Sequence, residues 1–384
     1  MLRCDTMKIA FAYDVPYPWH IGGIEAMNFN EAEELAKGND VHYFTTKWPG
    51  MRSNEFTYRG IKYHAYNETS QDLIYRHGRR SVREAVRYVL SLAQIYRHKF
   101  DVVITNAFPI LHLPFLKLYC KINNAKLIVQ VAEVWDEEYW KTYMGKMSGR
   151  LSYSYSKSAI KGADHYITIS STTTRNLAKF GIPRSKISEF APAVDDSVIK
   201  RVKSEKAHAS STVLFSGRLI KEKRLDVWLR ILSSATKSNG SINGLIVGSG
   251  PDRYNIDRQI WSLGLQSRVR IRNYYPDSAQ LYRQIRDSLA VLHTSEREGL
   301  GILAIESVML GTPVLIPQYS PIPDEVKGMC IVGSDKKLAQ MLVSMSRGKS
   351  VRLKADSKML SKFSKSHVRE FYARLFKKLG AKGR

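Results

Sequence analysis

Residues 295–317 read Ser-Glu-Arg-Glu-Gly-Leu-Gly-Ile-Leu-Ala-Ile-Glu-Ser-Val-Met-Leu-Gly-Thr-Pro-Val-Leu-Ile-Pro. An apolar run at residues 289–293 precedes this stretch and is typical of a buried parallel strand. After a glycine-rich turn, apolar residues continue at helical spacing over residues 302–310, until a glycine and a proline end the pattern. Residues 314–316 are apolar again. The stretch therefore predicts a strand, a loop, a helix and a second strand in succession.

Two acidic residues accompany the predicted helix. Glu298 lies in the loop before it, and Glu306 lies within it. Gly299 and Gly301 allow a tight turn that leaves backbone N–H groups open to an anion at the positive end of the helix. Carboxylates are strong acceptors for sugar hydroxyls, so a nucleotide sugar, which carries phosphates and hydroxyl-rich rings, suits both features. The spacing alone leaves open that both acids are simply solvated.

The pair Glu298 and Glu306, followed by Gly-Thr-Pro-Val, resembles the signature of retaining glycosyltransferases of the GT-B fold, in glycosyltransferase family 4 (glycosyl transferases group 1). The resemblance implies that Glu298 contacts hydroxyls of the donor sugar and that Glu306 binds the ribose. It also implies that the backbone between them reaches the distal phosphate. The residues concerned are Gly299, Leu300, Gly301, Ile302 and Leu303.

Length and composition set wider limits. A chain of 384 residues predicts two domains. Its formal net charge of +25, from 60 basic and 35 acidic residues, favours anionic partners: nucleic acid, an anionic membrane or phosphorylated substrates. The three cysteines are far apart, with no paired spacing and no nearby histidine cluster, and predict neither a disulfide framework nor a zinc site. With no apolar run of spanning length and no signal-peptide pattern, we expect a cytoplasmic protein.

The expected first domain covers residues 1–200. A strand at residues 8–13 is followed by Gly22 and Gly23 directly before a helix. Glycines in that place let the backbone approach a phosphate, and in the family a double glycine there contacts the donor diphosphate. His20 could reach the same cleft and is a candidate on the acceptor side, although a lone histidine in a loop is usually solvated.

Residues 76–99 predict a basic amphipathic helix. Val82, Val86 and Val89 recur at helical spacing, and arginines occupy several of the other positions. One interpretation is an ordinary surface helix. The other is a helix that docks on an anionic bilayer, with residues 73–75 inserting.

A further strand, at residues 126–131, leads into Glu133 and Trp135. Ligands bind at the carboxyl ends of parallel strands. Relatives usually carry a histidine near this position, and here Glu133 stands in its place. Glu133 and Trp135 are therefore candidates on the acceptor side, although the aromatic residue could equally belong to the core.

The expected second domain covers residues 201–365, and residues 366–384 are expected to form a helix that crosses back to the first domain. A strand ends at Gly217, Arg218 follows, and Lys223 comes shortly after. Two cations at a strand end suit a diphosphate, although basic residues are common throughout this chain. The segment is similar to the family's diphosphate-binding segment at Arg218 and Lys223. Gly248 follows the next strand in another tight turn.

These observations together predict an α/β protein of two doubly wound Rossmann-like domains that face each other across a cleft. The resemblance implies metal-independent, retaining transfer from a UDP- or GDP-linked sugar, with Arg218, Lys223 and Glu298 as catalytic residues and no cofactor beyond the donor. The basic surface favours a lipid-linked saccharide or lipid at the cytosolic face of the membrane as acceptor, with the enzyme peripheral there. The alternative is a nucleic-acid-binding or scaffolding protein on the same fold, although no nucleic-acid module is recognisable. A GT-B phosphorylase fits least, because no lysine context suggests a pyridoxal site.

Overall fold

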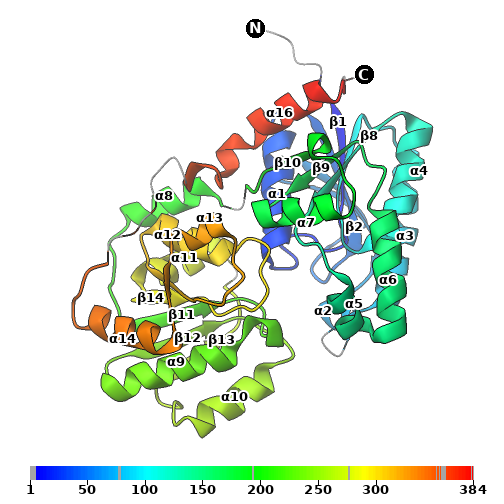
Figure 1. The fold of residues 1–384 in the computed structure, drawn as a ribbon. Helices are drawn as coiled ribbons and strands as arrows, with labels where there is room; N and C mark the ends of the chain where they lie inside the picture. Colours follow the sequence, from blue (N-terminus) through cyan, green and yellow to red (C-terminus); the bar gives the residue numbers. More distant parts are fainter. Residues whose placement is uncertain are drawn as a thin grey trace. The chain divides into compact units, whose positions relative to one another are not determined.

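The chain forms two α/β units, each with its own parallel sheet and hydrophobic core (Figure 1). The first unit comprises residues 1–193 and 364–384, and the second comprises residues 194–363. The expectation of two Rossmann-like domains is confirmed. The computed structural model describes residues 6–76, 79–192, 194–275, 277–351, 353, 355, 360–381 and 383.

The sheet of the first unit has the strand order β10-β9-β8-β7-β1-β2-β4-β3, and every neighbouring pair is parallel except β3 with β4. Its strands are β1 (Lys8–Ala12), β2 (Asp40–Lys47), β3 (Glu55–Tyr58), β4 (Ile61–Glu68), β7 (Val102–Asn106), β8 (Lys126–Val131), β9 (His165–Thr168) and β10 (Ile187–Glu189). The edge strand β3 was not predicted, because its residues are only partly buried or exposed and form no apolar run.

Helices cover both faces of this sheet. They are α1 (Gly23–Ala36), α2 (Gln71–Ile74), α3 (Val82–Ser91), α4 (Leu113–Asn123), α5 (Glu137–Met144), α6 (Lys146–Ala159), α7 (Ser171–Lys179) and α16 (Val368–Lys378), with 3-10 turns η1 (Leu92–Arg97), η2 (Ile110–His112), η3 (Arg184–Lys186) and η5 (Lys365–His367). The C-terminal helix α16 packs beside α1 (Figure 1). The Tyr372 hydroxyl donates a 2.6 Å hydrogen bond to the buried Glu31 carboxylate of α1, and Gln130 of β8 also donates to it.

The predicted helix over residues 76–99 is wrong in its extent and in part of its interpretation. Strands β5 (Tyr75–Arg76) and β6 (Arg79–Arg80) pair as a short hairpin, and the helix begins only at Val82, where Ser81 caps it. Ile74, expected to insert into a membrane, is buried at 1% exposure. The Tyr75 side chain lies outside the described part of the structure.

The second unit has a six-stranded parallel sheet in the order β13-β12-β11-β14-β15-β16. Its strands are β11 (Thr212–Ser216), β12 (Asn243–Val247), β13 (Val269–Arg272), β14 (Ala290–Leu292), β15 (Val314–Pro317) and β16 (Ile331–Gly333). Its helices are α8 (Asp196–Ser204), α9 (Leu225–Ser238), α10 (Arg253–Ser262), α11 (Ser278–Asp287), α12 (Ile302–Leu310), α13 (Asp324–Lys327) and α14 (Asp335–Ser346), with the 3-10 turn η4 (Lys221–Lys223). Helix α8, which contains residue 200, packs on α11 and α12 of this unit.

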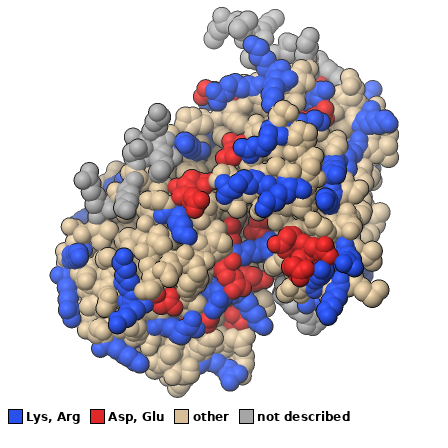
Figure 2. Space-filling model, in the orientation of Figure 1, with Lys and Arg blue, Asp and Glu red and all other residues tan. Residues whose placement is uncertain are grey.

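Lysine and arginine side chains are scattered over the visible face of both units and do not gather in one patch (Figure 2). The net charge therefore does not single out one binding surface on that face. No helix among the described residues is long and apolar enough to cross a membrane.

Candidate active site

Two glycine loops lie in backbone contact at the carboxyl ends of β11 and β12. A methyl group added at Gly248 would lie 1.9 Å from the carbonyl oxygen of Gly217, so only glycine fits there. The Leu219 N–H donates a 2.9 Å hydrogen bond to the carbonyl of Ser249 and ties the loops together. This contact holds the loop that carries Arg218 and leads to Lys223.

Lys223 pairs with Glu298 in the second unit. The Lys223 Nζ atom lies 2.8 Å from Glu298 Oε2, and the lysine side chain runs past Gly217. The Thr294 hydroxyl donates a 3.0 Å hydrogen bond to the carbonyl of Lys223. The structure therefore brings together Gly217, Lys223 and Glu298, which sequence analysis selected separately.

His293 also contacts Glu298, with its Nε2 atom 3.5 Å from Oε2. Burial alone would raise the pKa of Glu298, but the charge of Lys223 and the contact with His293 outweigh it and hold the pKa well below its usual range. Glu298 is therefore a fixed carboxylate at neutral pH. His293 was not selected from the sequence, although it stands at the end of a predicted strand, where ligand-binding residues concentrate.

Helix α12 begins at the residues predicted and presents an uncapped N-terminus. Its N-cap, Gly301, has φ +88°, and no side chain caps the first turn. A methyl group at Gly301 would lie 2.4 Å from Ile322 Cδ1. The buried Leu300 anchors the loop, and Gly299, Ile302 and Leu303 complete the backbone segment between the two glutamates. Such a helix start attracts anions.

Glu306 lies one turn into α12, in different surroundings. Its Oε1 atom accepts a 2.9 Å hydrogen bond from the Tyr282 hydroxyl of α11. Burial raises the pKa of Glu306 to about 7, and the bond from Tyr282 offsets only part of this rise. Tyr282 was not found from the sequence, since its place on an amphipathic helix carries no functional signal.

Arg218 follows Gly217 directly, and its side chain is exposed. Its position beside the glycine loop is the one expected of a phosphate-binding cation. A separate hollow of about 600 Å³ is lined by residues that include Arg224, Arg258 and Glu296. Neither Glu298 nor Glu306 lines it, so the candidate site is defined by the glycine loops and the start of α12.

In the first unit, Gly22 and Gly23 stand at the start of α1, as expected. The Glu25 carboxylate folds back over Gly22, and a methyl group there would lie 2.2 Å from Glu25 Oε2. His20 is not solvated: it is 7% exposed, its Nδ1 atom is 3.6 Å from Glu25 Oε1, and its ring packs on Trp48. The interpretation of His20 as a solvated loop residue is wrong, because the loop turns inward at this point.

Glu133 and Trp135 contact each other beyond β8. The Trp135 Nε1–H donates a 3.1 Å hydrogen bond to Glu133 Oε2, and the indole packs at 4.6 Å from Phe108. Tyr139 and Trp140 join this aromatic cluster. Trp140 is buried, whereas Trp135 is only partly buried. Trp135 therefore packs in the aromatic cluster and also orients the Glu133 carboxylate through its hydrogen bond.

An ion pair that sequence analysis missed lies near the end of β1. Arg80 of the hairpin donates to the buried Asp14, and the Arg80 backbone N–H donates a 2.6 Å hydrogen bond to the Tyr143 hydroxyl. Burial raises the pKa of Asp14, and the charge of Arg80 opposes that rise. Because Arg80 is engaged here, it is not one of the arginines available to a membrane.

Comparison with known families accounts for most of the chain. Residues 21–198 match the model of Glycosyltransferase Family 4, and residues 196–339 match the model of Glycosyl transferases group 1. Together they span the described candidate residues from Gly22 to Glu306.

Curated relatives align over part of their length. The GPI3 subunit of phosphatidylinositol N-acetylglucosaminyltransferase from Saccharomyces cerevisiae is 25% identical over 167 residues, which are 42% of this chain and 35% of the relative. The 2-deoxystreptamine N-acetyl-D-glucosaminyltransferase of Niallia circulans is 27% identical over 131 residues, which are 32% of this chain and 31% of the relative. The chain thus spans about a third of the length of these relatives.

Solved structures align over almost the whole chain. The trehalose-6-phosphate synthase OtsA superposes with a TM-score of 0.74 at 12% identity, covering 98% of this chain and 99% of its own. HepE from Anabaena, in complex with UDP and glucose, superposes with a TM-score of 0.63 at 14% identity. The superposition covers 97% of this chain and 100% of the HepE chain. At such identities the likeness establishes the fold. Taken with the two family models, it shows that the chain belongs to the GT-B glycosyltransferases and is of the family 4 type.

Proposed function

We propose that this chain transfers a sugar, with retention of anomeric configuration, from a UDP- or GDP-linked donor to a lipid-linked acceptor at an anionic membrane surface. The observation that carries the proposal is the set of groups around the start of α12. A fixed carboxylate, an uncapped helix N-terminus and a second carboxylate lie within residues 298–306, and the lysine partner reaches the first carboxylate from η4.

The phosphate side of the donor is assigned to the cations and the helix start. Arg218 and Lys223 both follow Gly217 after β11, and the N–H groups of Ile302 and Leu303 begin α12. A diphosphate is stabilised by both kinds of group. Since the leaving diphosphate gains charge as its bond to the sugar breaks, these groups would lower the barrier without a metal.

The hydroxyl side of the donor is assigned to the two glutamates. The charge of Lys223 keeps Glu298 ionised, so Glu298 can accept hydrogen bonds from sugar hydroxyls throughout the neutral pH range. Glu306 would accept hydroxyls of the ribose once it is ionised.

For the reaction itself, the bond between the anomeric carbon and the phosphate oxygen breaks, and the acceptor oxygen bonds to the same face of that carbon. The acceptor proton passes to the leaving phosphate oxygen. Positioning and leaving-group stabilisation carry the catalysis, and no protein side chain is assigned as a base.

The membrane part of the proposal rests on an exposed face of the first unit, here called the apolar-basic face. Helices α3, α4 and α6 all pack on η2. Each carries apolar side chains that are 40–83% exposed at one-turn spacing, namely Val82, Val86 and Leu90, then Leu118 and Ile122, then Met147, Leu151 and Tyr155. Arg83, Lys121 and Lys146 are exposed among them. Apolar insertion combined with basic charge is the pattern of a surface that binds anionic bilayers.

Transfer is tested with labelled UDP- and GDP-sugars, a lipid extract and EDTA, followed by NMR of the product's anomeric configuration. Label in the lipid phase with retained configuration is the expected result. An inverted product contradicts the retaining assignment. Strongly salt-dependent binding to duplex DNA, together with no turnover of any donor, would instead favour the nucleic-acid alternative.

Membrane docking is tested by sedimentation with phosphatidylglycerol and phosphatidylcholine vesicles at low salt. We expect binding to the anionic vesicles only, and its loss in a Leu90→Asp, Leu151→Asp double variant. Trp261→Asp, which changes a 70% exposed residue of the second unit, is the matched control and should bind as the unchanged protein does. Equal sedimentation of all three proteins would refute the docking face.

A further inference from the structure

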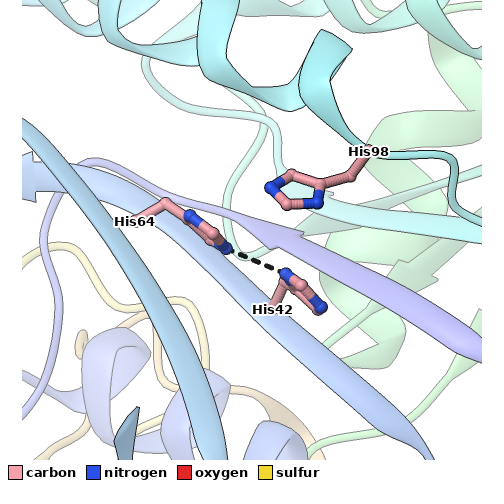
Figure 3. Close-up of side chains that lie close together, drawn as sticks. All are labelled: His42, His64 and His98. Carbon is pink, nitrogen blue, oxygen red and sulfur yellow. Dashed lines mark hydrogen bonds between the residues drawn. The ribbon is translucent and has the colours of Figure 1, made fainter. Parts of the chain in front are cut away.

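Three histidines that are distant in sequence converge in the first unit. His42 lies in β2, His64 in β4, and His98 directly after η1 (Figure 3). Each histidine offers one ring nitrogen, and these three nitrogens all lie within 4.8 Å of one another. We propose that these three residues form a binding site for a divalent transition-metal ion, with Zn²⁺ as the best fit. This proposal is independent of the glycosyl-transfer site.

The convergence follows from strand pairing. Strands β2 and β4 are parallel neighbours, with Phe44 opposite His64, so His42 and His64 fall on the same face of the sheet. The Nδ1 atom of His42 lies 2.8 Å from the Nε2 atom of His64 (Figure 3). His98 faces both rings, with ring centroids at 5.0 Å and 4.9 Å.

The outer nitrogens of two rings face carboxylates. His42 Nε2 lies 3.2 Å from Asp40 Oδ1, and His64 Nδ1 lies 3.4 Å from Glu55 Oε1. Carboxylates occupy this position beside metal-bound histidines, although neither contact has hydrogen-bond geometry here. Both carboxylates are themselves held in place, Asp40 by Lys62 at 2.7 Å and Glu55 by the Tyr66 hydroxyl at 2.6 Å.

Counting protons points to a cation between the rings. A neutral imidazole has one N–H and one lone pair. As the rings lie, one inner nitrogen carries a proton and donates it to the other at 2.8 Å, so only one of the two outer nitrogens can carry a proton toward its carboxylate. A metal ion bound by both inner nitrogens would move both protons to the outer nitrogens, where each faces a carboxylate.

Neutral imidazole is the form that ligates a metal ion. Lys8, Lys62 and Arg97 contribute positive charge nearby, and Asp40 and Glu55 counter it.

The surroundings suit a three-nitrogen site with one open position. Phe44 and Phe100 pack on the histidine rings and exclude water from that side. His42 and His64 are buried, whereas His98 is partly exposed and leaves access for an ion and a water ligand. Tetrahedral zinc holds its nitrogens at about 2.1 Å, hence about 3.4 Å from each other, so the His42–His64 pair would open slightly on binding.

The site is separate from the candidate residues of this unit. His42 and His64 lie in the first halves of their strands, whereas Glu133 follows the carboxyl end of β8. A metal here would join β2, β4 and the end of η1, and would brace the sheet beside its edge strand β3.

The test uses the full-length protein without a polyhistidine tag. Zn²⁺ titration by calorimetry should give one site per chain, and Co²⁺ should give the visible absorption of a tetrahedral complex. His64→Gln and His98→Gln should each weaken binding at least tenfold, and Asp40→Asn should weaken it less. His208→Gln, which changes an exposed histidine of the second unit, should bind as the unchanged protein does.

Circular dichroism checks that the variants fold. If they do not, X-ray absorption of the unchanged protein with Zn²⁺ decides by counting nitrogen ligands. Absence of binding, or equal binding by the His64→Gln, His98→Gln and His208→Gln variants, overturns the proposal. Stabilisation by nucleotide sugars is measured in parallel with EDTA, so failure of the metal site and failure of the transferase assignment give different results.

Discussion

The loop before α12 and the middle of α12 carry the same acidic side chain in opposite surroundings. In the loop, Glu298 faces Lys223 at 2.8 Å and His293 at 3.5 Å, and its pKa is held low. In the helix, Glu306 has a hydroxyl from Tyr282 as partner, and burial raises its pKa to about 7. A cation in one place and a neutral hydroxyl in the other account for the difference.

The comparison teaches that the two glutamates of the motif are not equivalent. Glu298 is part of a charge pair that also positions Lys223, the lysine proposed to bind phosphate. Glu306 is poised to change charge near neutral pH, so a ligand that donates hydroxyls to it would draw it toward the ionised form. Substitutions that remove one of these two environments test the difference, and the most damaging substitution is considered first.

Lys223→Ala should have the largest consequence, because it removes the cation proposed to bind the donor phosphates and leaves Glu298 partly buried without its main partner. We expect a loss of roughly 100- to 1,000-fold in turnover, as for other groups that stabilise developing negative charge, and about 3 kcal/mol in the free energy of unfolding. Turnover and urea denaturation measure the two effects. Lys221→Ala, at an exposed position of the same turn, is the control and should change turnover and stability little.

Gly301→Ala should cost about 2 kcal/mol or more of stability and abolish donor binding. Its φ of +88° disfavours any side chain, and the new methyl group would collide with Ile322 at 2.4 Å. Gly311 ends the same helix at φ +90° with no atom within 4 Å of an added methyl group. Gly311→Ala should therefore show only the backbone cost, about 1 kcal/mol, and should keep donor binding. Equal losses in the two variants would mean that the contact with Ile322 is unimportant.

Donor affinity should depend on pH through Glu306. Below its pKa of about 7 the carboxyl is protonated and cannot accept two hydroxyls, so affinity should fall up to about tenfold for each pH unit below 7. Stability of the free protein should move in the opposite direction. Because the folded pKa is raised above the ordinary 4.5, the folded state holds the extra proton, and stability declines as pH rises from about 4.5 to about 7.

Glu306→Gln separates these effects, since glutamine does not titrate. Its donor affinity should be weak and independent of pH, and its melting temperature should exceed that of the unchanged protein increasingly as pH rises toward 7. Parallel pH profiles for the two proteins would show that another group titrates.

Tyr282→Phe should give the smallest effect. It removes one hydrogen bond, worth about 1 kcal/mol, and that bond lowers the pKa of Glu306. The pH profile of donor affinity should therefore shift to higher pH, with little change in affinity at pH 8. A shift to lower pH would contradict the role assigned to Tyr282. Tyr275→Phe, a hydroxyl deletion in the segment before α11, serves as the control.

Local patterns predicted the second unit well. The spacing of apolar residues and the flanking glycines define α12, and a parallel sheet places the ends of its strands at one edge. Gly217, Lys223 and Glu298 could therefore be chosen from the sequence, although their mutual contacts could not.

The histidine cluster escaped sequence analysis for a physical reason. His42, His64 and His98 show no metal-binding spacing, and only the register between β2 and β4 brings two of them together. The helical pattern of α3 likewise did not reveal its buried face: Glu84, Ala85 and Tyr88 are buried, while Val82 and Val86 face outward. Burial of the polar Glu84 depends on its bond with Thr69, which no helical periodicity reveals.

The central claim is that the Lys223–Glu298 pair and Glu306 form a nucleotide-sugar site. Its most direct test is the melting temperature of the protein with UDP-, GDP- and ADP-sugars, in EDTA. One nucleotide series at a hundred times its dissociation constant should stabilise the protein by about 2.7 kcal/mol. Lys223→Ala and Glu306→Gln should each abolish or greatly reduce that shift, and Lys221→Ala should keep it. No shift with any donor, or an undiminished shift in Lys223→Ala and Glu306→Gln, would contradict the claim.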